Sequence, residues 1–252
     1  MKNYNKIVLS YSGGLDTTVA IPWLQEKTGA KIVASCIDVG QKEDFGKAVE
    51  RGEQAGAESV GVLNCVDDYA QDFILPAIKA NALYEGEYPL VSALSRPLIV
   101  KNLVETAAQV GADAIAHGCT GKGNDQIRFE LSLAALAPEL VMLAPARHWG
   151  FTRDDAIRYA LEKGIDIPVT KKSPYSIDEN LWGRSIECGV LEDAWLEPPP
   201  DVYQLTADPG NAPDDPEDIE IQFHEGCPVA IDGQPKDLVS LINSLGQQAG
   251  VH

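Results

Sequence analysis

The chain has 252 residues, of which 44% are hydrophobic, and its 38 acidic and 20 basic residues give a formal net charge of -18. This length and hydrophobic content predict a globular protein with one large core or two modest ones. The negative charge counts against nucleic-acid binding, because proteins that bind nucleic acids present a basic surface to the phosphates, and it favours small substrates.

From Lys6 to about Pro168, short β-rich runs alternate with helical patterns, which is typical of βαβ units around a parallel sheet. We therefore predict an α/β fold for this part of the chain. A helix is predicted from about Thr17, and Pro22 in its second turn is expected to bend it. The predicted strands are Lys6–Ser10, Lys31–Ile37, Ser59–Leu63, Ala112–Ala116 and Leu140–Leu143.

The composition changes after Pro168, where "TKKSPYSIDENLWGRS" is polar and six prolines lie between Glu197 and Asp218. Farther on, "IEIQF" and "CPVAI" flank "HEG" and predict a hairpin, and an amphipathic helix is predicted over Lys236–Gln248. We expect two domains: a nucleotide-binding domain over residues 1–168 and an α+β domain over residues 169–252.

The cysteines and the amino terminus indicate the cellular compartment. None of the five cysteines forms a C-x-x-C pair, which disfavours both a disulfide framework and a thiolate zinc site. The start "MKNYNKIVLS" lacks the apolar segment of a signal peptide, and the longest apolar runs are no longer than a strand. We expect a cytoplasmic protein that binds neither a membrane nor a metal through cysteine.

The loop "SYSGGLDTT" follows the first predicted strand, at the edge of the sheet where ligands bind. Gly13 and Gly14 are expected to take positive φ values and to expose backbone N–H groups beside a helix amino terminus, which attracts anions. Asp16 has two interpretations: it caps the helix, or it meets a Mg²⁺ ion that accompanies phosphates. The alternative for the whole loop is an ordinary strand-turn-helix connection.

A second loop, "HGCTGKGND", follows the strand predicted at Ala112–Ala116 and should reach the same edge of the sheet. Asp125 is suited to hold an ammonium group, and Arg128, one helical turn later, to hold a carboxylate. Alternatively, Asp125 caps a helix that starts at Gln126, and Arg128 is a solvated surface cation. His117 is expected to make a structural hydrogen bond.

Two other features of this region have open interpretations. Lys122 is a cation of the binding cleft or an exposed loop lysine, and Cys119 has no neighbour in the sequence that marks it as a nucleophile. By itself, "SPYSIDENLWGRS" favours an interdomain linker over a substrate-facing loop, because it is too polar for a core.

Four motifs together resemble one protein family. "YSGGLDTT" is similar to the pyrophosphate-binding loop of the N-type ATP pyrophosphatases, whose Rossmann-like domain is of the adenine nucleotide alpha hydrolase type. "DVGQKEDF", "HGCTGKGNDQIRFE" and "SPYSIDENLWGRSIE" resemble, in the same order, stretches of the argininosuccinate synthase family. That resemblance implies a ligase of arginine biosynthesis and the urea cycle that joins citrulline and aspartate through citrullyl-AMP, using ATP and Mg²⁺.

The resemblance also implies roles for individual residues, and it makes no residue a nucleophile or general base. The implied ATP-binding residues are Ser10, Tyr11, Ser12, Gly13, Gly14, Leu15, Asp16, Thr17, Thr18, Ile37 and Gly118. Those implied to bind aspartate are Thr120, Asn124 and Asp125, and those implied to bind citrulline are Tyr88, Ser92, Asn124, Arg128, Ser176 and Ser185.

The chain departs from the family in two places. Val91-Ser92-Ala93 stands where the family commonly has Gly-Thr-Ser, so the role of Ser92 is the less direct assignment. Family members also continue well beyond the position of His252, with two more citrulline-site residues and a helix for homotetramer assembly. We therefore expect a truncated enzyme or fragment that binds ATP but makes little argininosuccinate alone. The rival interpretations are a non-catalytic ATP or amino-acid binding fragment and an RNA-modifying adenylating enzyme.

Overall fold

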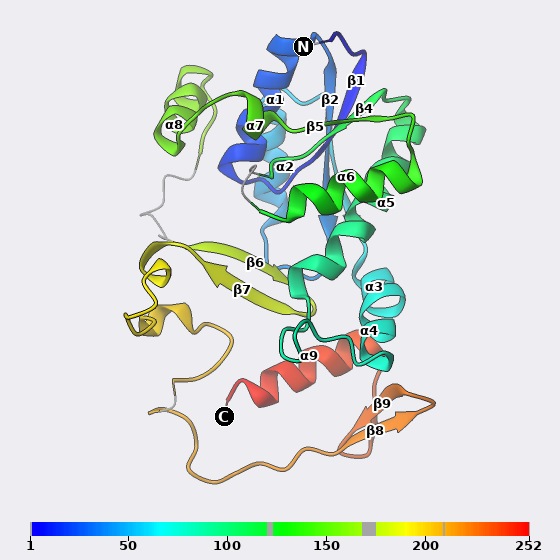
Figure 1. Cartoon of the computed structure of the whole chain (residues 1–252), viewed down its shortest axis with the longest axis vertical. Helices are drawn as coiled ribbons and strands as arrows, with labels where there is room; N and C mark the ends of the chain where they lie inside the picture. The colour runs from blue at the N-terminus through cyan, green and yellow to red at the C-terminus, as the bar shows by residue number, and fades with distance from the viewer. Residues whose placement is uncertain (1, 120–122, 168–174, 209, 252) are drawn as a thin grey trace. The chain divides into compact units, whose positions relative to one another are not determined.

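The computed structural model describes residues 2–119, 123–167, 175–208 and 210–251. Two compact units are distinguished, and both are discontinuous in the sequence (Figure 1). Unit 1 comprises Met1–Asp38, Glu43–Cys65 and Ser95–Val169, and unit 2 comprises Val39–Lys42, Val66–Leu94 and Thr170–His252. These units do not coincide with a single boundary at residue 168. The predicted division into a domain over residues 1–168 and a domain over residues 169–252 stays a prediction.

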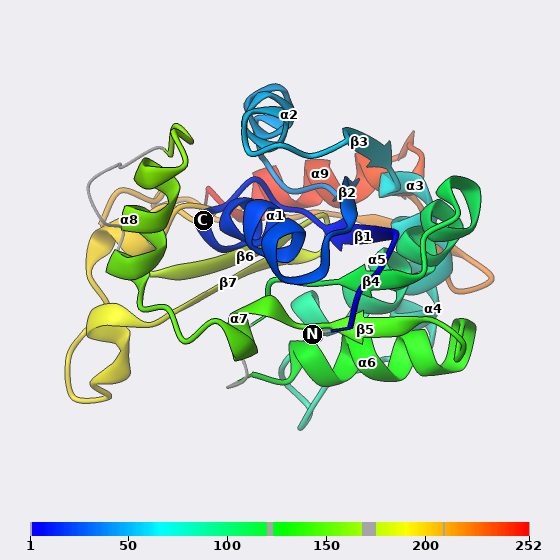
Figure 2. The same cartoon turned by 90° about the horizontal axis from the view of Figure 1, so that it is seen from above.

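Unit 1 contains a five-stranded parallel sheet with the strand order β3-β2-β1-β4-β5, which confirms the predicted α/β class. Figure 2 shows β2, β1, β4 and β5 following one another across the sheet. Its strands are β1 (Lys6–Ser10), β2 (Lys31–Asp38), β3 (Ser59–Asn64), β4 (Ala114–Ala116) and β5 (Val141–Leu143).

All five strands were predicted, but β4 and β5 begin later than expected. The N–H of Ala112 bonds to Ala107 O, 2.9 Å away, at the end of the preceding helix, and the N–H of Leu140 bonds to Ala137 O at 3.0 Å. Backbone groups that close a helix end or a turn are not available to the sheet ladder. Both strands are therefore shortened at their first residues.

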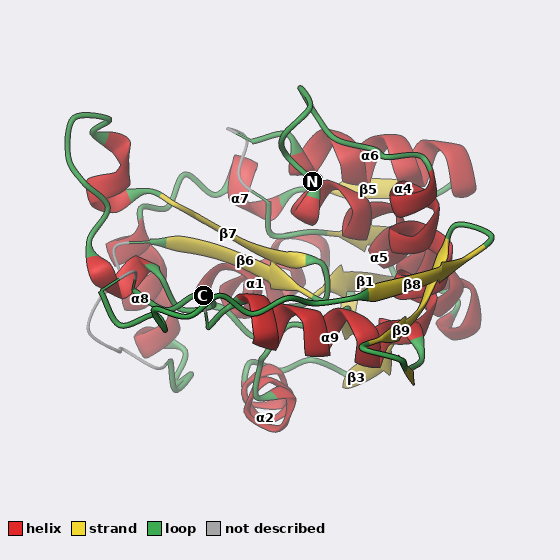
Figure 3. Ribbon diagram, turned by 90° about the horizontal axis from the view of Figure 1, so that it is seen from below, coloured by secondary structure: helices red, strands yellow, loops and turns green. Residues whose placement is uncertain are grey.

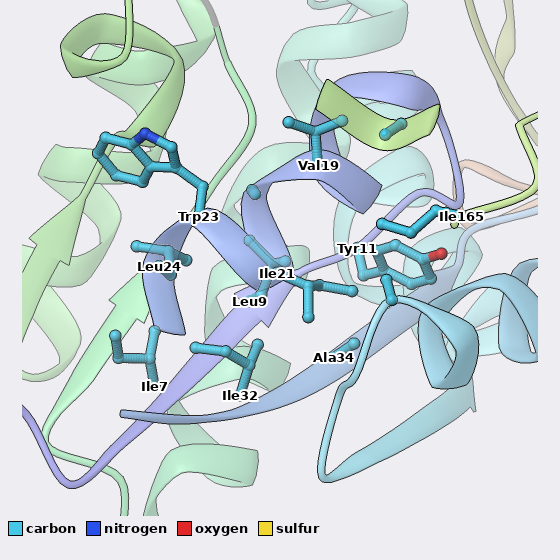
Figure 4. Packing of buried hydrophobic residues seen from close by; sticks show 14 of the residues in the cluster. Ile7, Leu9, Tyr11, Val19, Ile21, Trp23, Leu24, Ile32, Ala34 and Ile165 are labelled. Carbon is cyan, nitrogen blue, oxygen red and sulfur yellow. The ribbon is translucent and has the colours of Figure 1, made fainter. Parts of the chain in front are cut away.

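Helices cover both faces of this sheet. Alternate residues of β1 point to opposite faces, so Ile7 and Leu9 belong to one core cluster and Val8 to another. In Figure 4, Ile7, Leu9 and Ile32 from the strands lie next to Ile21 and Leu24 from α1. The first cluster includes residues of α1 (Leu15–Thr28), α2 (Phe45–Gln54) and α8 (Arg153–Glu162), and the second includes residues of α5 (Val91–Val110) and α6 (Asp125–Leu136).

The described residues of unit 1 also form the short helix α7 (Pro145–His148). Within the described ranges, no helix is both long enough and apolar enough to cross a membrane.

Unit 2 combines short helices with small antiparallel sheets, coloured red and yellow in Figure 3. Its helical elements are α3 (Val66–Tyr69), the π-helix η1 (Ala70–Ile74), α4 (Leu75–Lys79), the 3₁₀ helices η2 (Gly189–Glu192) and η3 (Pro200–Val202), and α9 (Leu238–Ala249). One sheet pairs β6 (Ser176–Asn180) with β7 (Gly183–Glu187), and the other has the order β10-β9-β8, formed by β8 (Ile221–His224), β9 (Cys227–Ile231) and β10 (Gln234–Pro235).

The predicted hairpin and final helix of this region are confirmed, with small shifts of their ends. The hairpin is β8–β9, and β8 begins at Ile221 rather than at Ile219. The helix begins at Leu238 because Asp237 caps it, with the N–H of Ser240 donating to Asp237 Oδ1 at 2.8 Å.

The interpretation of "SPYSIDENLWGRS" as a loop or linker was wrong for its described residues. They form the antiparallel hairpin β6–β7, in which Ile177 pairs with Ile186 and Asp178 with Ser185. At the turn, the N–H of Trp182 donates to Asn180 Oδ1 at 2.9 Å. Side-chain capping of this kind lets a polar segment form a turn without a hydrophobic signal in the sequence. Ser173 and Pro174 lie outside the described residues.

Candidate functional site

The carboxyl ends of β1 and β4 form a topological switch point in unit 1. From β1 the sheet extends through β2 and β3 on one side and through β4 and β5 on the other. Ligands of open α/β sheets bind at such a point, outside the carboxyl ends of the strands. The loop after β4 approaches the first turn of α1 there, since a Cβ on Gly118 would lie 2.6 Å from Thr17 Cγ2.

Only one of the two loop glycines has a positive φ. Gly13 has φ +69°, whereas Gly14 has φ -74° and ψ 170°, so the expectation of positive φ was wrong for Gly14. A Cβ on Gly13 would lie 2.7 Å from Ala48 Cβ, and Arg51 Nη1 donates a hydrogen bond to Gly13 O. The second helix of the unit therefore fixes the glycine that makes the turn.

The helix amino terminus begins two residues earlier than predicted. Its first intrahelical bond runs from Thr18 N to Gly14 O at 3.0 Å, so the N–H groups of Leu15, Asp16 and Thr17 precede the helical ladder. Ser12, which is exposed, has its Oγ 3.1 Å from Thr17 Oγ1. Backbone donors and a hydroxyl at the positive end of a 14-residue helix suit a phosphate ligand.

Asp16 does not cap this helix, because the N-cap residue is Gly14 and Asp16 lies in the first turn. Its exposed carboxylate makes no hydrogen bond or ion pair within the described part of the chain. Desolvation by neighbouring protein atoms raises its pKa, against the opposing charge of Arg153. One exposed carboxylate beside a phosphate site fits the way Mg²⁺ is bound, through one or two carboxylates together with phosphate oxygens.

Several residues implied to bind ATP have side chains that support the loop. The Tyr11 hydroxyl donates to Ala48 O at 3.1 Å and lies 3.2 Å from Thr18 Oγ1. Tyr11 and Thr18 are buried, and burial raises the pKa of the Tyr11 phenol. Ser10 and Leu15 are half-buried, and Ile37 is buried near the end of β2. A contact of Tyr11 or Thr18 with ATP would therefore have to use the backbone.

His117 makes the structural hydrogen bond that the sequence predicted. Its side chain is fully buried, its Nδ1 accepts the N–H of Cys119 at 3.1 Å, and its ring centroid lies 5.2 Å from that of Phe129. Desolvation lowers its pKa to about 4. Thr120, Gly121 and Lys122, which follow in this loop, lie outside the described residues, so the predictions made for Thr120 and Lys122 stay predictions.

The low pKa of His117 predicts a pH-dependent stability. The unfolded chain takes up a proton near pH 6.5 and the folded chain only near pH 4, so stability falls as the pH drops through that window. Between pH 7 and pH 5 this amounts to about 2 kcal/mol. We expect His117→Asn, which keeps a hydrogen-bond acceptor, to remove that part of the loss in urea unfolding. Equal losses in the two proteins would contradict the assignment.

Asp125 lies between two arginines. Arg96 donates to Asp125 Oδ2 from Nε at 3.0 Å and from Nη2 at 2.7 Å, and Arg128 Nη1 donates to Oδ1 at 2.6 Å. Partial burial raises the pKa of Asp125, but these hydrogen bonds and charges outweigh it and lower the pKa. We call Arg96, Asp125 and Arg128 the arginine-aspartate cluster.

This cluster rules out the two alternatives that the sequence left open. Helix α6 begins at Asp125, its N-cap Asn124 makes no capping bond, and Arg128 is ion-paired rather than merely solvated. Sequence reasoning missed Arg96, which stands 29 residues from Asp125 inside helix α5. No local motif connects these two positions, so only the packing of α5 near the start of α6 reveals the pair.

Unit 2 brings together three of the residues implied to bind citrulline. The Tyr88 hydroxyl lies 3.4 Å from Ser185 Oγ. The Tyr88 oxygen also accepts a hydrogen bond from the N–H of Ser92, at 3.4 Å. Ser176 lies on the same face of the hairpin as Ser185, because Ser185 pairs with Asp178, two residues after Ser176. Asn124 and Arg128, also implied to bind citrulline, belong to unit 1.

Comparisons with known proteins give the family. A model of the "Arginosuccinate synthase N-terminal HUP domain" matches residues 6–166, and a model of the "Arginosuccinate synthase C-terminal domain" matches residues 175–252. The chain belongs to the argininosuccinate synthase family. The N-terminal match covers all five strands of the parallel sheet, and the C-terminal match begins just before β6.

Individual members of the argininosuccinate synthase family are more than half identical to this chain. The argininosuccinate synthase of Limosilactobacillus reuteri (strain DSM 20016) is 56% identical over 247 residues, which are 98% of this chain and 60% of that protein. Those of Bacillus licheniformis and Bacillus subtilis (strain 168) are 54% and 52% identical over all of this chain and 62% of each relative. The chain therefore spans about 60% of the length of these relatives.

The described residues contain no group of three or more His, Cys, Asp or Glu side chains arranged to hold a metal ion. A Mg²⁺ ion carried by ATP does not need such a group, because it is bound through one or two carboxylates together with phosphate oxygens.

Proposed function

We propose that this chain provides the ATP-binding and amino-acid-binding residues of an argininosuccinate synthase. In the proposed reaction, citrulline and aspartate are joined while ATP is split into AMP and pyrophosphate. The observation that carries the proposal is the loop Ser12–Gly14 at the switch point of the parallel sheet, where the first N–H groups of α1 precede the helical ladder. The family membership supports the same reaction.

The first step activates citrulline. Its ureido oxygen attacks the α-phosphorus of ATP, a phosphorus–oxygen bond forms, and pyrophosphate leaves with the electrons of the bond that breaks. The N–H groups of Leu15, Asp16 and Thr17 and the Ser12 hydroxyl are placed to stabilise the charge that develops on pyrophosphate. This step needs positioning and charge stabilisation, and no side chain of the protein acts as a nucleophile.

Asp16 is the residue that would hold Mg²⁺ together with the phosphates. When bound, the ion neutralises part of the phosphate charge. Because the carboxylate is exposed in the first turn of α1, its position beside the phosphates is compatible with this role.

The second step joins aspartate to the activated carbon and releases AMP. We propose that Thr120, Asn124 and Asp125 hold the aspartate amine, as the family resemblance implies. Asp125 already shares its two oxygens with Arg96 and Arg128, so the arginine-aspartate cluster carries one more positive than negative charge. Such a cluster attracts the carboxylates of the amino-acid substrates as well.

An isotope-exchange assay tests the proposed function. If citrulline is activated as citrullyl-AMP, labelled pyrophosphate exchanges into ATP only when citrulline is present, and aspartate is not needed. We expect slow exchange for this chain alone and faster exchange for a full-length protein that contains it, in which a variant with Ser12→Ala and Thr17→Ala should exchange more slowly. ATP binding without citrulline-dependent exchange would instead indicate a non-catalytic binding protein. By the same resemblance we propose that the full-length protein, with the helix for assembly that the family has beyond the position of His252, forms a homotetramer, which light scattering tests.

A further inference from the structure

Leu90 has an uncommon backbone conformation. Its φ is +60°, in the left-handed region that branched side chains seldom adopt. Residues held in such a conformation persist only where surrounding interactions impose it, and they often occur at ligand sites. Leu90 stands between Tyr88 and Ser92, two residues implied to bind citrulline.

Hydrogen bonds from unit 2 hold the peptide groups on both sides of Leu90. The indole Nε1 of Trp182 donates to Pro89 O at 2.8 Å. On the other side, Asn180 Nδ2 donates to Val91 O at 2.8 Å, and the Tyr69 hydroxyl donates to the same oxygen at 3.1 Å. Both donors to Val91 O are buried, where a lost hydrogen bond costs more than at the surface.

Contacts at the turn of the β6–β7 hairpin fix the orientation of the Asn180 and Trp182 donors. Asn180 Oδ1 accepts the N–H of Trp182 at 2.9 Å, so both ends of the Asn180 amide are used and its orientation is set. The adjoining Gly183 packs on the same segment, since a Cβ there would lie 3.2 Å from Val91 Cγ2. The hairpin and the segment 88–92 thus form one interlocked structure within unit 2.

We propose that Asn180 and Trp182 are positioning residues for citrulline. By holding Leu90 in the left-handed conformation, they place the Tyr88 hydroxyl within 3.4 Å of both the Ser92 N–H and Ser185 Oγ before the substrate arrives. A site assembled in advance loses less conformational freedom on binding and binds more tightly. This inference rests on the proposed function, because it takes citrulline as the ligand of that cluster.

Substitutions that remove a single donor test the proposal. Trp182→Phe removes the indole N–H and keeps an aromatic ring, and Asn180→Asp removes the amide donor and keeps the acceptor oxygen. Trp195→Phe is the matched control, because Trp195 is 96% exposed. Citrulline affinity is measured by calorimetry in the presence of α,β-methylene ATP, and the affinity for that nucleotide is measured separately.

We expect each of the two variants to bind citrulline about tenfold more weakly, which is the loss of roughly one buried hydrogen bond. Their affinity for the nucleotide should stay within about twofold of the original, and Trp195→Phe should change neither value. A purely structural role would lower the melting temperature and leave both affinities unchanged in the folded protein, which would overturn the inference. Failure of the unsubstituted protein to bind citrulline would overturn the proposed function as well.

A second pair of variants keeps the test valid if the first pair folds poorly. Leu90→Gly allows the left-handed conformation without strain, whereas Leu90→Val makes it more costly because valine is branched at Cβ. We expect citrulline affinity to stay within about threefold for Leu90→Gly and to fall about tenfold for Leu90→Val. Equal citrulline affinities in these two variants would contradict the requirement for a left-handed Leu90.

Discussion

Gly13→Ala is expected to destabilise the protein and to weaken ATP binding at least tenfold. The backbone of Gly13 has φ +69°, which costs an alanine about 1 to 2 kcal/mol. The new Cβ would also lie 2.7 Å from Ala48 Cβ and 3.2 Å from Ala48 Cα, so helix α2 or the loop must move. Overpacking of this kind costs a further 1 to 3 kcal/mol, roughly.

Gly14→Ala is the matched control, and it corrects a prediction that treated the two glycines alike. Gly14 has φ -74°, and a Cβ there would meet only Ser12 Oγ, at 3.3 Å. Its stability should therefore change by less than about 1 kcal/mol, because any residue adopts this conformation. Thermal melting and calorimetric titration with ATP measure both effects. Normal melting and normal ATP binding of Gly13→Ala would show that the loop is not held as described.

Asp125→Ala is expected to impair the use of both amino acids. Removing the carboxylate leaves Arg96 and Arg128 without their shared partner. Their side chains are only 14% and 34% exposed, so water replaces that partner incompletely. The loss of charge-assisted hydrogen bonds from a partly buried site costs about 1.5 to 3 kcal/mol, so the KM for aspartate should rise roughly ten- to a hundredfold. The KM for citrulline should also rise, because Arg128, which is proposed to bind citrulline, loses the contact that orients it.

A role of Asp125 in aspartate binding alone would affect only aspartate, whereas the carboxylate shared by Arg96 and Arg128 extends the effect to citrulline. Glu130→Ala is the matched control on the same helix. It removes the ion pair between Glu130 Oε1 and Arg147 Nη1, which are 2.8 Å apart and belong to side chains that are about half exposed. Exposed pairs contribute little, so this variant should keep both KM values. Steady-state kinetics of a full-length protein that contains this chain, with each substrate varied in turn, provides the measurement. Unchanged aspartate kinetics of Asp125→Ala would refute the assignment of Asp125.

Much of unit 1 was predictable from the sequence because its signals are local. The alternation of β-rich runs and helical patterns indicated all five strands of the parallel sheet, and the central strands β1, β2 and β4 are buried between covering helices. The position of "SYSGGLDTT" directly after β1 was enough to place that loop at the ligand edge. The family also followed from the order of four short motifs.

The hairpin β6–β7 could not be predicted in this way. Only Ile177 and Ile186 are apolar among its strand residues, so neither strand shows a hydrophobic alternation. Its pairing depends on backbone hydrogen bonds, on the Asn180 cap of its turn and on contacts with the segment 88–92. Those contacts join residues about ninety positions apart, as in the bond from Asn180 to Val91, which spans 89.

The sequence by itself determined the five strands of the parallel sheet, the hairpin β8–β9, the glycine loop and the residue types available to a site, because periodicity and turn chemistry act over a few neighbouring residues. Only the tertiary structure decided that Gly13 alone takes a positive φ, since Ala48 and Arg51 from another helix fix that turn. It likewise decided that Arg96 pairs with Asp125 and that Trp182 and Asn180 hold the backbone around Leu90. Such contacts depend on packing between elements distant in the chain, and no local spacing encodes them.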